Sequence, residues 1–231
     1  MRQARHVTTT TGHDEDSGYS EHHGHPGHTV LQLPVRALED WVRERTRSYD
    51  AGFVSADPRF GHAHVTALAP FAPCPSPADL AEVGRIAAAT APMTIRFAEL
   101  GQFPNGIIHL RPEPEGPLRR LTEVLVAAFP HLPPYEGRFG PRVDPHLTVD
   151  AASPTVTLAS TRRLLGPRIP VTCSLARLQL AWWESGRCHV VHEWPLAGAA
   201  EAAGTADDAA NGVTDWATDA AADEGRFPPA D

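Results

Sequence analysis

Apolar and polar positions follow two rhythms in the middle of the chain, and each rhythm predicts one kind of element. Short apolar runs bounded by Gly, Pro or polar clusters predict strands, whereas apolar residues spaced three and four apart predict helices. We expect strands over residues 28–35, 62–71, 93–97, 106–111, 145–150, 171–183 and 187–194. We expect helices over residues 36–49, 76–90, 117–129 and 158–165.

The helix expected at 76–90 carries the clearest start signal. Ser76 suits the N-cap, Pro77 suits the first helical position, and an acidic residue follows in the first turn. A turn signal at residues 184–186 joins the last two strands as a hairpin. Because strands and helices mix without a strict βαβ rhythm and the hairpin implies antiparallel pairing, the predicted fold class is α+β.

The two ends of the chain lack the aliphatic residues that a folded core needs. Residues 1–27 are rich in His, Thr, Gly and Asp, and residues 199–231 are rich in Ala and Asp. We therefore predict a disordered tail on either side of one domain at 28–198. The His-rich run at 21–28 can bind a transition metal, but a polar low-complexity tail explains the same composition better.

The net charge of −8 belongs mainly to the tails, which carry about −2 and −7 and leave residues 28–200 near +1. A near-neutral domain argues against tight binding of long nucleic acid and fits a small substrate or an RNA terminus. All 20 basic residues are Arg. Without lysine the chain cannot use an adenylated-lysine, Schiff-base, pyridoxal phosphate or P-loop mechanism.

The cysteines and the N-terminus bear on the compartment. Cys74, Cys173 and Cys188 form no CxxC pair, and their odd number argues against a disulfide framework, so we expect reduced thiols. The N-terminus has no apolar leader, and no apolar run reaches 18 residues. We expect a cytoplasmic monomer without a membrane partner.

One short pattern occurs twice. Residues 64–66 read His-Val-Thr and residues 146–148 read His-Leu-Thr, and both lie in expected strands. Because successive strand residues point to opposite faces, the His and the Thr of each copy share one face while the aliphatic residue packs behind them. Two such strands side by side would present two imidazoles and two hydroxyls to one cleft.

That set of side chains suits phosphoryl transfer without a metal. A neutral imidazole can take a proton from water or a ribose hydroxyl, and a protonated one can give a proton to the leaving oxygen. Threonine hydroxyls can donate hydrogen bonds to non-bridging phosphate oxygens, where negative charge develops.

The surrounding residues extend the pattern. HVTALAPF at 64–71 and PHLTVD at 145–150 resemble the paired signature of the 2H (two-histidine) phosphoesterases, in particular their 2′-5′ RNA ligase-like branch. Residues 129–149 and 178–196 are also similar to segments of that family, so the resemblance covers about 28–197. It implies a bilobed fold of two pseudo-symmetric halves, each with an antiparallel sheet and flanking helices, around a central groove.

The resemblance also implies an activity: opening or hydrolysis of phosphodiesters, commonly the 2′,3′-cyclic phosphate ends of RNA, with neither metal nor cofactor. The catalytic residues that it implies are His64, Thr66, His146 and Thr148. By the same resemblance His146 is the base for water and His64 the acid. Since the chain lacks lysine, any RNA joining would be the reverse of ring opening.

Other side chains near the two motifs are candidates for substrate binding. Phe71 and Tyr135 can stack a nucleobase, although core packing is the better explanation of Phe71. Arg138 and Arg142 can contact a phosphate, or can be ordinary loop arginines. Trp182 and Trp183 are adjacent on an expected strand, so only one of them can face the protein core, and the other can lie at the groove rim.

Two alternatives remain open at this stage. His62 and His64 lie two apart on one expected strand and can chelate zinc, with His109 or His146 as a third ligand, which would make the protein a metal-dependent hydrolase. The chain can also be a module that binds RNA ends or nucleotides without chemistry.

Overall fold

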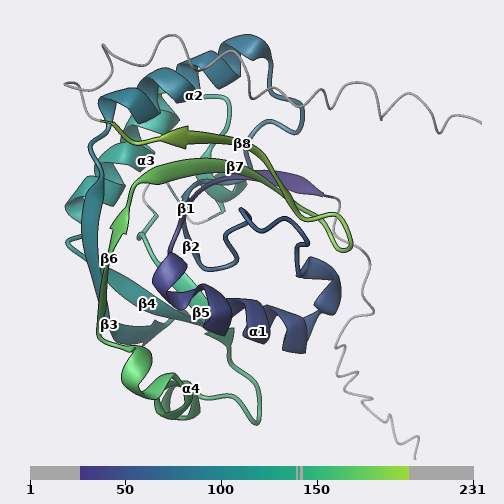
Figure 1. Ribbon diagram of the computed structural model, residues 1–231, viewed down its shortest axis with the longest axis vertical. Coiled ribbons are helices and arrows are strands. Elements are labelled where there is room, and N and C mark those ends of the chain that lie inside the picture. Colours follow the sequence, from purple (N-terminus) through teal and green to yellow (C-terminus); the bar gives the residue numbers. More distant parts are fainter. Residues whose placement is uncertain (1–26, 139, 141–142, 198–231) are drawn as a thin grey trace, which may run out of the picture.

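The computed structural model describes residues 27–138, 140 and 143–197 (Figure 1). Apart from Gly27, both predicted tails lie outside the described residues. The strands are β1 His28–Pro34, β2 His64–Leu68, β3 Met93–Gln102, β4 Ile107–Glu113, β5 Leu147–Ala151, β6 Val171–Leu175, β7 Arg177–Trp183 and β8 His189–Pro195. The helices are α1 Glu39–Tyr49, α2 Pro77–Ala89, α3 Gly116–Ala128 and α4 Leu158–Leu165. Within these ranges no helix has the length and apolar character needed to cross a bilayer.

The eight strands form one antiparallel sheet in the order β6-β3-β4-β5-β2-β1-β7-β8. The fold is therefore α+β, as predicted. The two expected halves are the two ends of this sheet, with four strands each. They join where β2 lies beside β5, and the register of that junction has one residue pair, Val65 with Leu147.

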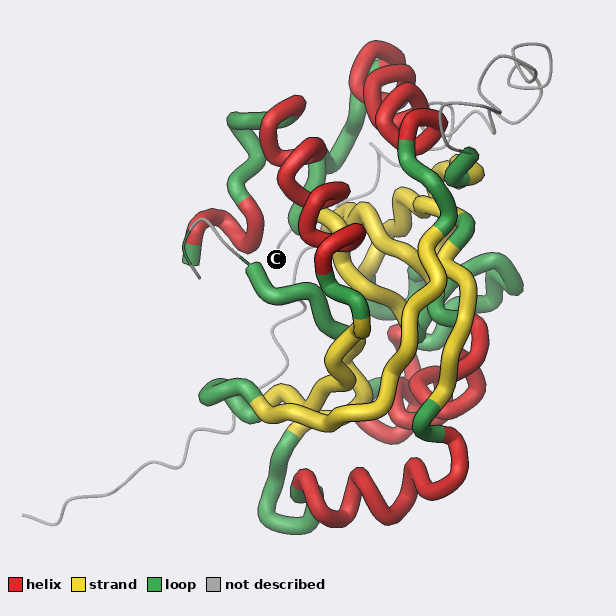
Figure 2. Tube along the Cα trace, turned by 90° about the vertical axis from the view of Figure 1, so that its left-hand side faces the viewer, coloured by secondary structure: helices red, strands yellow, loops and turns green. Residues whose placement is uncertain are grey.

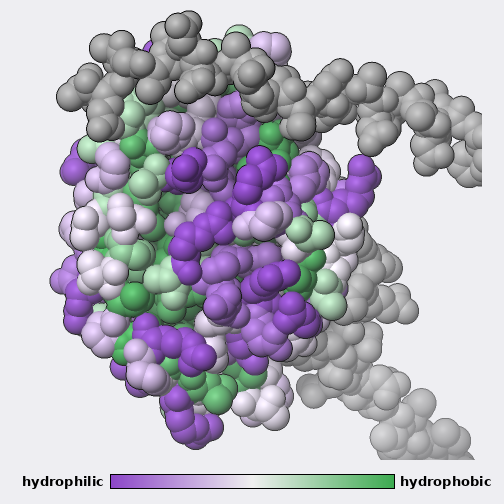
Figure 3. All heavy atoms as spheres, in the orientation of Figure 1, coloured by the Kyte–Doolittle hydropathy of each residue, from purple (hydrophilic) through white to green (hydrophobic). Residues whose placement is uncertain are grey.

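The helices cover the sheet in two pairs (Figures 1 and 2). On one side α2 and α3 pack against each other, with α3 against β2 and α2 against β8. On the other side α1 contacts β5 and α4 contacts β3. Figure 3 shows hydrophilic side chains gathered over α1, whose solvent-facing residues are mostly charged. Thus α1, from the first half of the sequence, covers the sheet half that contains β5, and α3, from the second half, covers the sheet half that contains β2.

The predicted start of α2 is confirmed in detail. Ser76 is the N-cap, and its hydroxyl accepts a hydrogen bond from the Asp79 N–H at 3.1 Å. The Asp79 carboxylate in turn accepts a hydrogen bond from the Ser76 N–H at 2.8 Å, which completes a capping box. Val83, Ile86 and Ala87 on this helix point into the core.

The strand expected over 171–183 is in fact two strands that break at Ala176. β6 pairs with β3, as in Ile95 with Cys173, whereas β7 pairs with β1 and β8. The apolar pattern runs through the break, so hydrophobicity alone hides it. The hairpin of β7 and β8 is confirmed, with Leu178 opposite Trp194.

Candidate active site

The central residues of the two His-x-Thr motifs meet at the junction of the sheet halves. Val65 and Leu147 are partners there, and their side chains are 1% and 0% exposed in a single core that spans both halves. Because strand residues alternate faces, the His and Thr on either side of each point to the opposite face of the sheet. The sequence-based assignment of faces therefore fits the structure.

The antiparallel register also sets which side chains oppose each other. Continued by one residue in each direction, it places Thr66 across from His146 and His64 across from Thr148. Each imidazole thus faces a hydroxyl from the other strand. The structure brings all four predicted catalytic residues together.

A groove of about 600 Å³ opens along this face. Its volume lies in the range typical of small-molecule sites. The side chains around it come from β2, β5, the β3–β4 turn and the loop before β5: Thr66, Phe103, Pro104, Asn105, Ile107, Tyr135, Val143, Asp144, His146 and Thr148.

The His64 ring is held by a hydrogen bond to the backbone. Its Nδ1 lies 2.9 Å from the carbonyl oxygen of His62, and because a carbonyl only accepts, Nδ1 carries the proton. The other nitrogen, Nε2, is then the one that can exchange a proton with a ligand. Burial, together with the nearby charge of His146, lowers the pKa of His64 to about 4 against the opposing effect of the His62 carbonyl.

His146 repeats this arrangement. Its Nδ1 donates to the carbonyl oxygen of Asp144 at 2.8 Å, again the residue two positions earlier. Burial lowers the pKa of His146, and the Asp144 carbonyl and carboxylate oppose that effect. The Asp144 carboxylate is held by Arg119 at 2.8 Å, which keeps the pKa of the carboxyl low. Both imidazoles are therefore neutral near pH 7.

Tyr135 approaches Thr66 from the loop before β5. Burial raises the pKa of its phenol, and a hydrogen bond with the Thr66 side chain opposes this effect. The Tyr135 N–H donates to the carbonyl of Ala69 at 2.6 Å. Tyr135 and Glu136 both have positive φ, at 49° and 56°, a region that is costly for residues with a side chain. The loop is held in this strained form beside the groove.

Comparison with known proteins agrees with the paired motifs. The family model of the 2′-5′ RNA ligase superfamily matches residues 34–187, which include both motifs and most of the domain. The chain belongs to this superfamily. A search among curated proteins found no match.

Solved structures show likeness at low identity. Escherichia coli LigT complexed with 3′-AMP is 16% identical, with a TM-score of 0.48, and the match covers 74% of this chain and 99% of that one. TT0787 of Thermus thermophilus is 20% identical, with a TM-score of 0.47 and the same coverage. Membership of the 2′-5′ RNA ligase superfamily rests on the match to the family model.

The predicted substrate-binding residues of this superfamily member have different surroundings. Phe71 is 2% exposed and packs edge-on against Phe129 at 5.0 Å, so its ring belongs to the core and has no open face for a base. Arg138 is exposed and paired with Glu136 at 2.6 Å. Arg142 lies outside the described residues. Of the three that lie within the described residues, only Tyr135 lines the groove.

Trp183 is half-buried beside His64, with 5.2 Å between the ring centroids. Its indole N–H donates to the Gln32 side chain at 3.0 Å, which fixes the ring. Trp182 instead donates to Glu184 at 2.8 Å. Of the two adjacent tryptophans, the second is the one next to a predicted catalytic residue.

The proposed zinc pair is contradicted by the contacts of His62. Its Nδ1 donates to Glu39 at 2.6 Å, and its Nε2 accepts the Ser55 N–H at 3.1 Å. Both ring nitrogens are thus engaged in a side chain that is 4% exposed, and neither has a lone pair free for a metal. Burial raises the pKa of Glu39, but the His62 and Ala63 hydrogen bonds outweigh it and the pKa lies below the usual value. His62 therefore ties the start of β2 to α1.

Sequence reasoning missed Phe103, Asn105 and Asp144 as groove residues. Asp144 lies two residues before His146 in the chain. Phe103 and Asn105 line the groove because β4 pairs with β5, which brings the β3–β4 turn beside His146. No local pattern announces that pairing, although the Asn-Gly turn signal next to Phe103 marks where the chain reverses.

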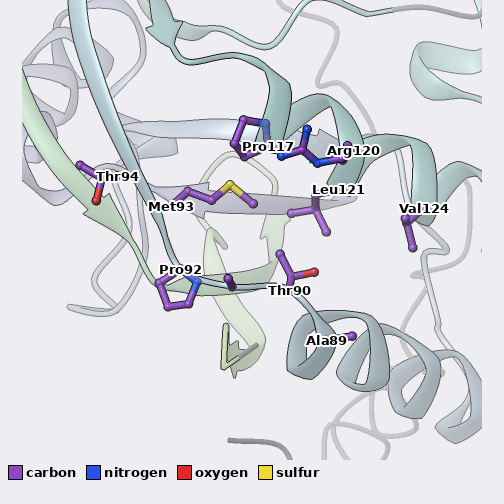
Figure 4. Close-up of a pocket in the computed structure, with 10 residues that line it drawn as sticks. Ala89, Thr90, Pro92, Met93, Thr94, Pro117, Arg120, Leu121 and Val124 are labelled. Carbon is purple, nitrogen blue, oxygen red and sulfur yellow. The ribbon is translucent and has the colours of Figure 1, made fainter. Parts of the chain in front are cut away.

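A second cavity of about 460 Å³ lies away from the motifs, between the end of α2, the start of β3 and the first turns of α3. Figure 4 shows Met93 and Leu121 pointing into it, with Arg120 at its edge. It is lined by none of the predicted site residues.

Proposed function

We propose that this protein is a metal-independent phosphodiesterase that opens 2′,3′-cyclic phosphates, on an RNA end or a free nucleotide, by acid–base catalysis with two histidines. The observation that carries the proposal is the matched pair of imidazoles. In each ring, Nδ1 is held by the carbonyl two residues earlier, so that Nε2 is left for proton transfer. Each ring also lies across from a threonine hydroxyl of the other motif.

In the proposed reaction one neutral imidazole takes a proton from water as the water oxygen attacks phosphorus. The bond from phosphorus to one ribose oxygen breaks, and the other imidazole, protonated, gives its proton to that oxygen. Thr66 and Thr148 donate hydrogen bonds to the non-bridging oxygens. Ligation would use the same steps with a ribose hydroxyl in place of water: its oxygen forms the new bond to phosphorus, and the ribose oxygen that leaves the ring takes the proton.

The resemblance assigns His146 as base and His64 as acid. His64 is the harder of the two to protonate, since its pKa is lowered to about 4. An anionic phosphate between the rings favours their protonated forms and raises both pKa values. The pH dependence of the two single variants therefore decides which ring is the acid and which the base.

The walls of the groove support a nucleoside next to the phosphate. Phe103 and Tyr135 are half-buried aromatic side chains, and Ile107 and Val143 add apolar surface. Base–aromatic stacking suits such a wall and does not need a strongly basic surface. We further propose that the protein acts as a cytoplasmic monomer and that residues 28–198 suffice for activity.

The deciding experiment is hydrolysis of a 2′,3′-cyclic nucleotide by the purified protein, with and without EDTA. Turnover that survives EDTA supports the proposal. Activity that disappears with EDTA and returns with zinc would refute the metal-free mechanism. Saturable binding of the cyclic nucleotide without turnover would instead identify a binding module.

A further inference from the structure

A third imidazole lies beside the site and has no part in the reaction above. His109 is on β4, where it pairs with Thr148 of β5 on one side and with Gly101 of β3 on the other. Because paired residues share a face, its ring lies on the same face of the sheet as Thr148. The residue is 5% exposed, so the ring is covered from solvent.

Three rings contact one another there. Phe103 stacks on His109 with 4.0 Å between centroids and 17° between planes. His146 lies edge-on to both, 4.9 Å from Phe103 and 5.5 Å from His109. One side of the His146 ring is therefore covered by these two rings.

Gly101 provides the space that His109 occupies. A Cβ at residue 101 would lie 2.7 Å from Nε2 and 2.9 Å from Cε1 of His109, closer than real Cβ contacts. Any larger residue at 101 would have to push the His109 ring away. Since Phe103 covers one face of that ring, the ring cannot move without disturbing its contact with His146.

His109 is held by these ring contacts rather than by strong polar bonds. Within the described residues its Nδ1 makes no hydrogen bond of ordinary geometry, unlike Nδ1 of His64 and His146. Burial lowers the pKa of His109, and the charges of His146 and Arg111 lower it further, against opposing effects of the Ile107 backbone and Asp144. The ring is neutral near pH 7 and, with Phe103, covers one side of the His146 ring.

We propose that His109 is a positioning residue: seated on Gly101 and stacked under Phe103, its uncharged ring holds the His146 imidazole in place and keeps water from that side of it. The groups that set the charge around His146 are then Asp144, from the loop before β5, and His64 of β2. The expected effect on turnover rests on the proposed function, but the effect on the His146 ring does not.

Two variants test the proposal from opposite directions. His109→Ala removes the ring that covers one side of His146. Gly101→Ala keeps every imidazole but adds the Cβ that displaces His109. Each should lower kcat roughly 10- to 100-fold with a much smaller change in KM, because a misplaced catalytic group affects the chemical step. Gly116→Ala is the matched control, since its Cβ would meet only the end of Arg120, at 3.4 Å.

NMR titration of the His146 ring, assigned by its loss in His146→Ala, supplies a readout that does not depend on activity. In His109→Ala the pKa should rise toward the ordinary histidine value, because water reaches the ring. In Gly101→Ala the His146 signals should shift, and in Gly116→Ala they should not. If His109→Ala does not fold, Gly101→Ala decides by the same measurement.

The double variant completes the test. Once His109 is Ala, the added Cβ at residue 101 meets empty space, so Gly101→Ala should cost nothing further and the two effects should not multiply. Independent, multiplying effects, or an unchanged His146 titration in both single variants, would overturn the proposal. If the wild-type protein shows no phosphodiesterase activity, the proposed function fails while the titrations still decide the role of His109.

Discussion

Replacing His64 and His146, the proposed catalytic histidines, one at a time should remove one limb of the pH profile of kcat/KM, and a different limb for each. The reaction needs one neutral and one protonated imidazole. Burial lowers the pKa of His64 to about 4 and holds the pKa of His146 below its ordinary value of 6.5. With these values the wild-type rate rises with pH up to about 4, is level up to the pKa of His146, and then falls about tenfold per unit.

The magnitude follows from the same values. If His64 is the acid, about one molecule in 1000 carries its proton at pH 7, since the pKa lies about three units lower. That fraction corresponds to about 4 kcal/mol in the free enzyme. Activity at pH 7 should therefore be below activity near pH 5, unlike that of an enzyme with two unperturbed histidines.

The variants then tell the acid from the base. If His64 is the acid, residual activity of His64→Ala should rise through the pKa of His146 and stay level at high pH. Residual activity of His146→Ala should fall as the pH rises past about 4. If the residual activity of His64→Ala instead falls with pH and that of His146→Ala rises, His64 is the base and His146 the acid.

Initial rates with a 2′,3′-cyclic nucleotide between about pH 3.5 and 9 provide the measurement, with circular dichroism at each pH to confirm folding. Each replacement should lower kcat by about 10²- to 10⁴-fold, and the double variant should fall well short of the product. If both variants melt early and lose activity only in proportion to unfolded protein, the two histidines are structural and the mechanism is wrong.

Three further predictions concern other parts of the molecule. Thr66→Val and Thr148→Val keep the shape and remove a hydroxyl, so each should cost about 1–4 kcal/mol of transition-state stabilisation, measured from kcat/KM, with an unchanged melting temperature. A melting temperature that falls together with kcat/KM would contradict this. A chain cut to residues 28–198 should hydrolyse substrate at a near-native rate, and a loss of activity with folding intact would show that a tail reaches the groove. His62→Ala should lower the free energy of unfolding by about 1–3 kcal/mol in urea, because the Glu39 carboxylate loses the ring N–H that donates to it. Loss of a zinc-dependent activity with unchanged stability would contradict this structural role.

The sequence predicted the parts of the site that depend on local alternation. The faces of residues 64–66 and 146–148 follow from strand geometry alone, and the start of α2 follows from Ser76 and Asp79. The end of β3 was not predictable in this way. The register shifts between Phe97 and Glu99, which interrupts the alternation, and the strand continues beyond the residues whose pattern marks it.

The remaining misses come from contacts between distant segments. The sequence indicates for His109 only the role of a zinc ligand, because nothing near it in sequence shows that Phe103 will stack on it or that β4 will lie beside β5. Phe71 lies shortly after the first motif, yet its ring turns to the core against Phe129. Side-chain direction beyond the end of a strand is set by tertiary packing, which a single sequence does not display.

Because β2 and β5 are joined by a single residue pair, the distance between the His64 and His146 rings depends on how the two sheet halves are oriented. His64 belongs to one half and His146 to the other, and their strands share only the Val65–Leu147 pair. A rotation of one half against the other would change the distance between the two Nε2 atoms. The side chains packed behind the Val65–Leu147 pair would then affect the proposed proton transfer without contacting the substrate.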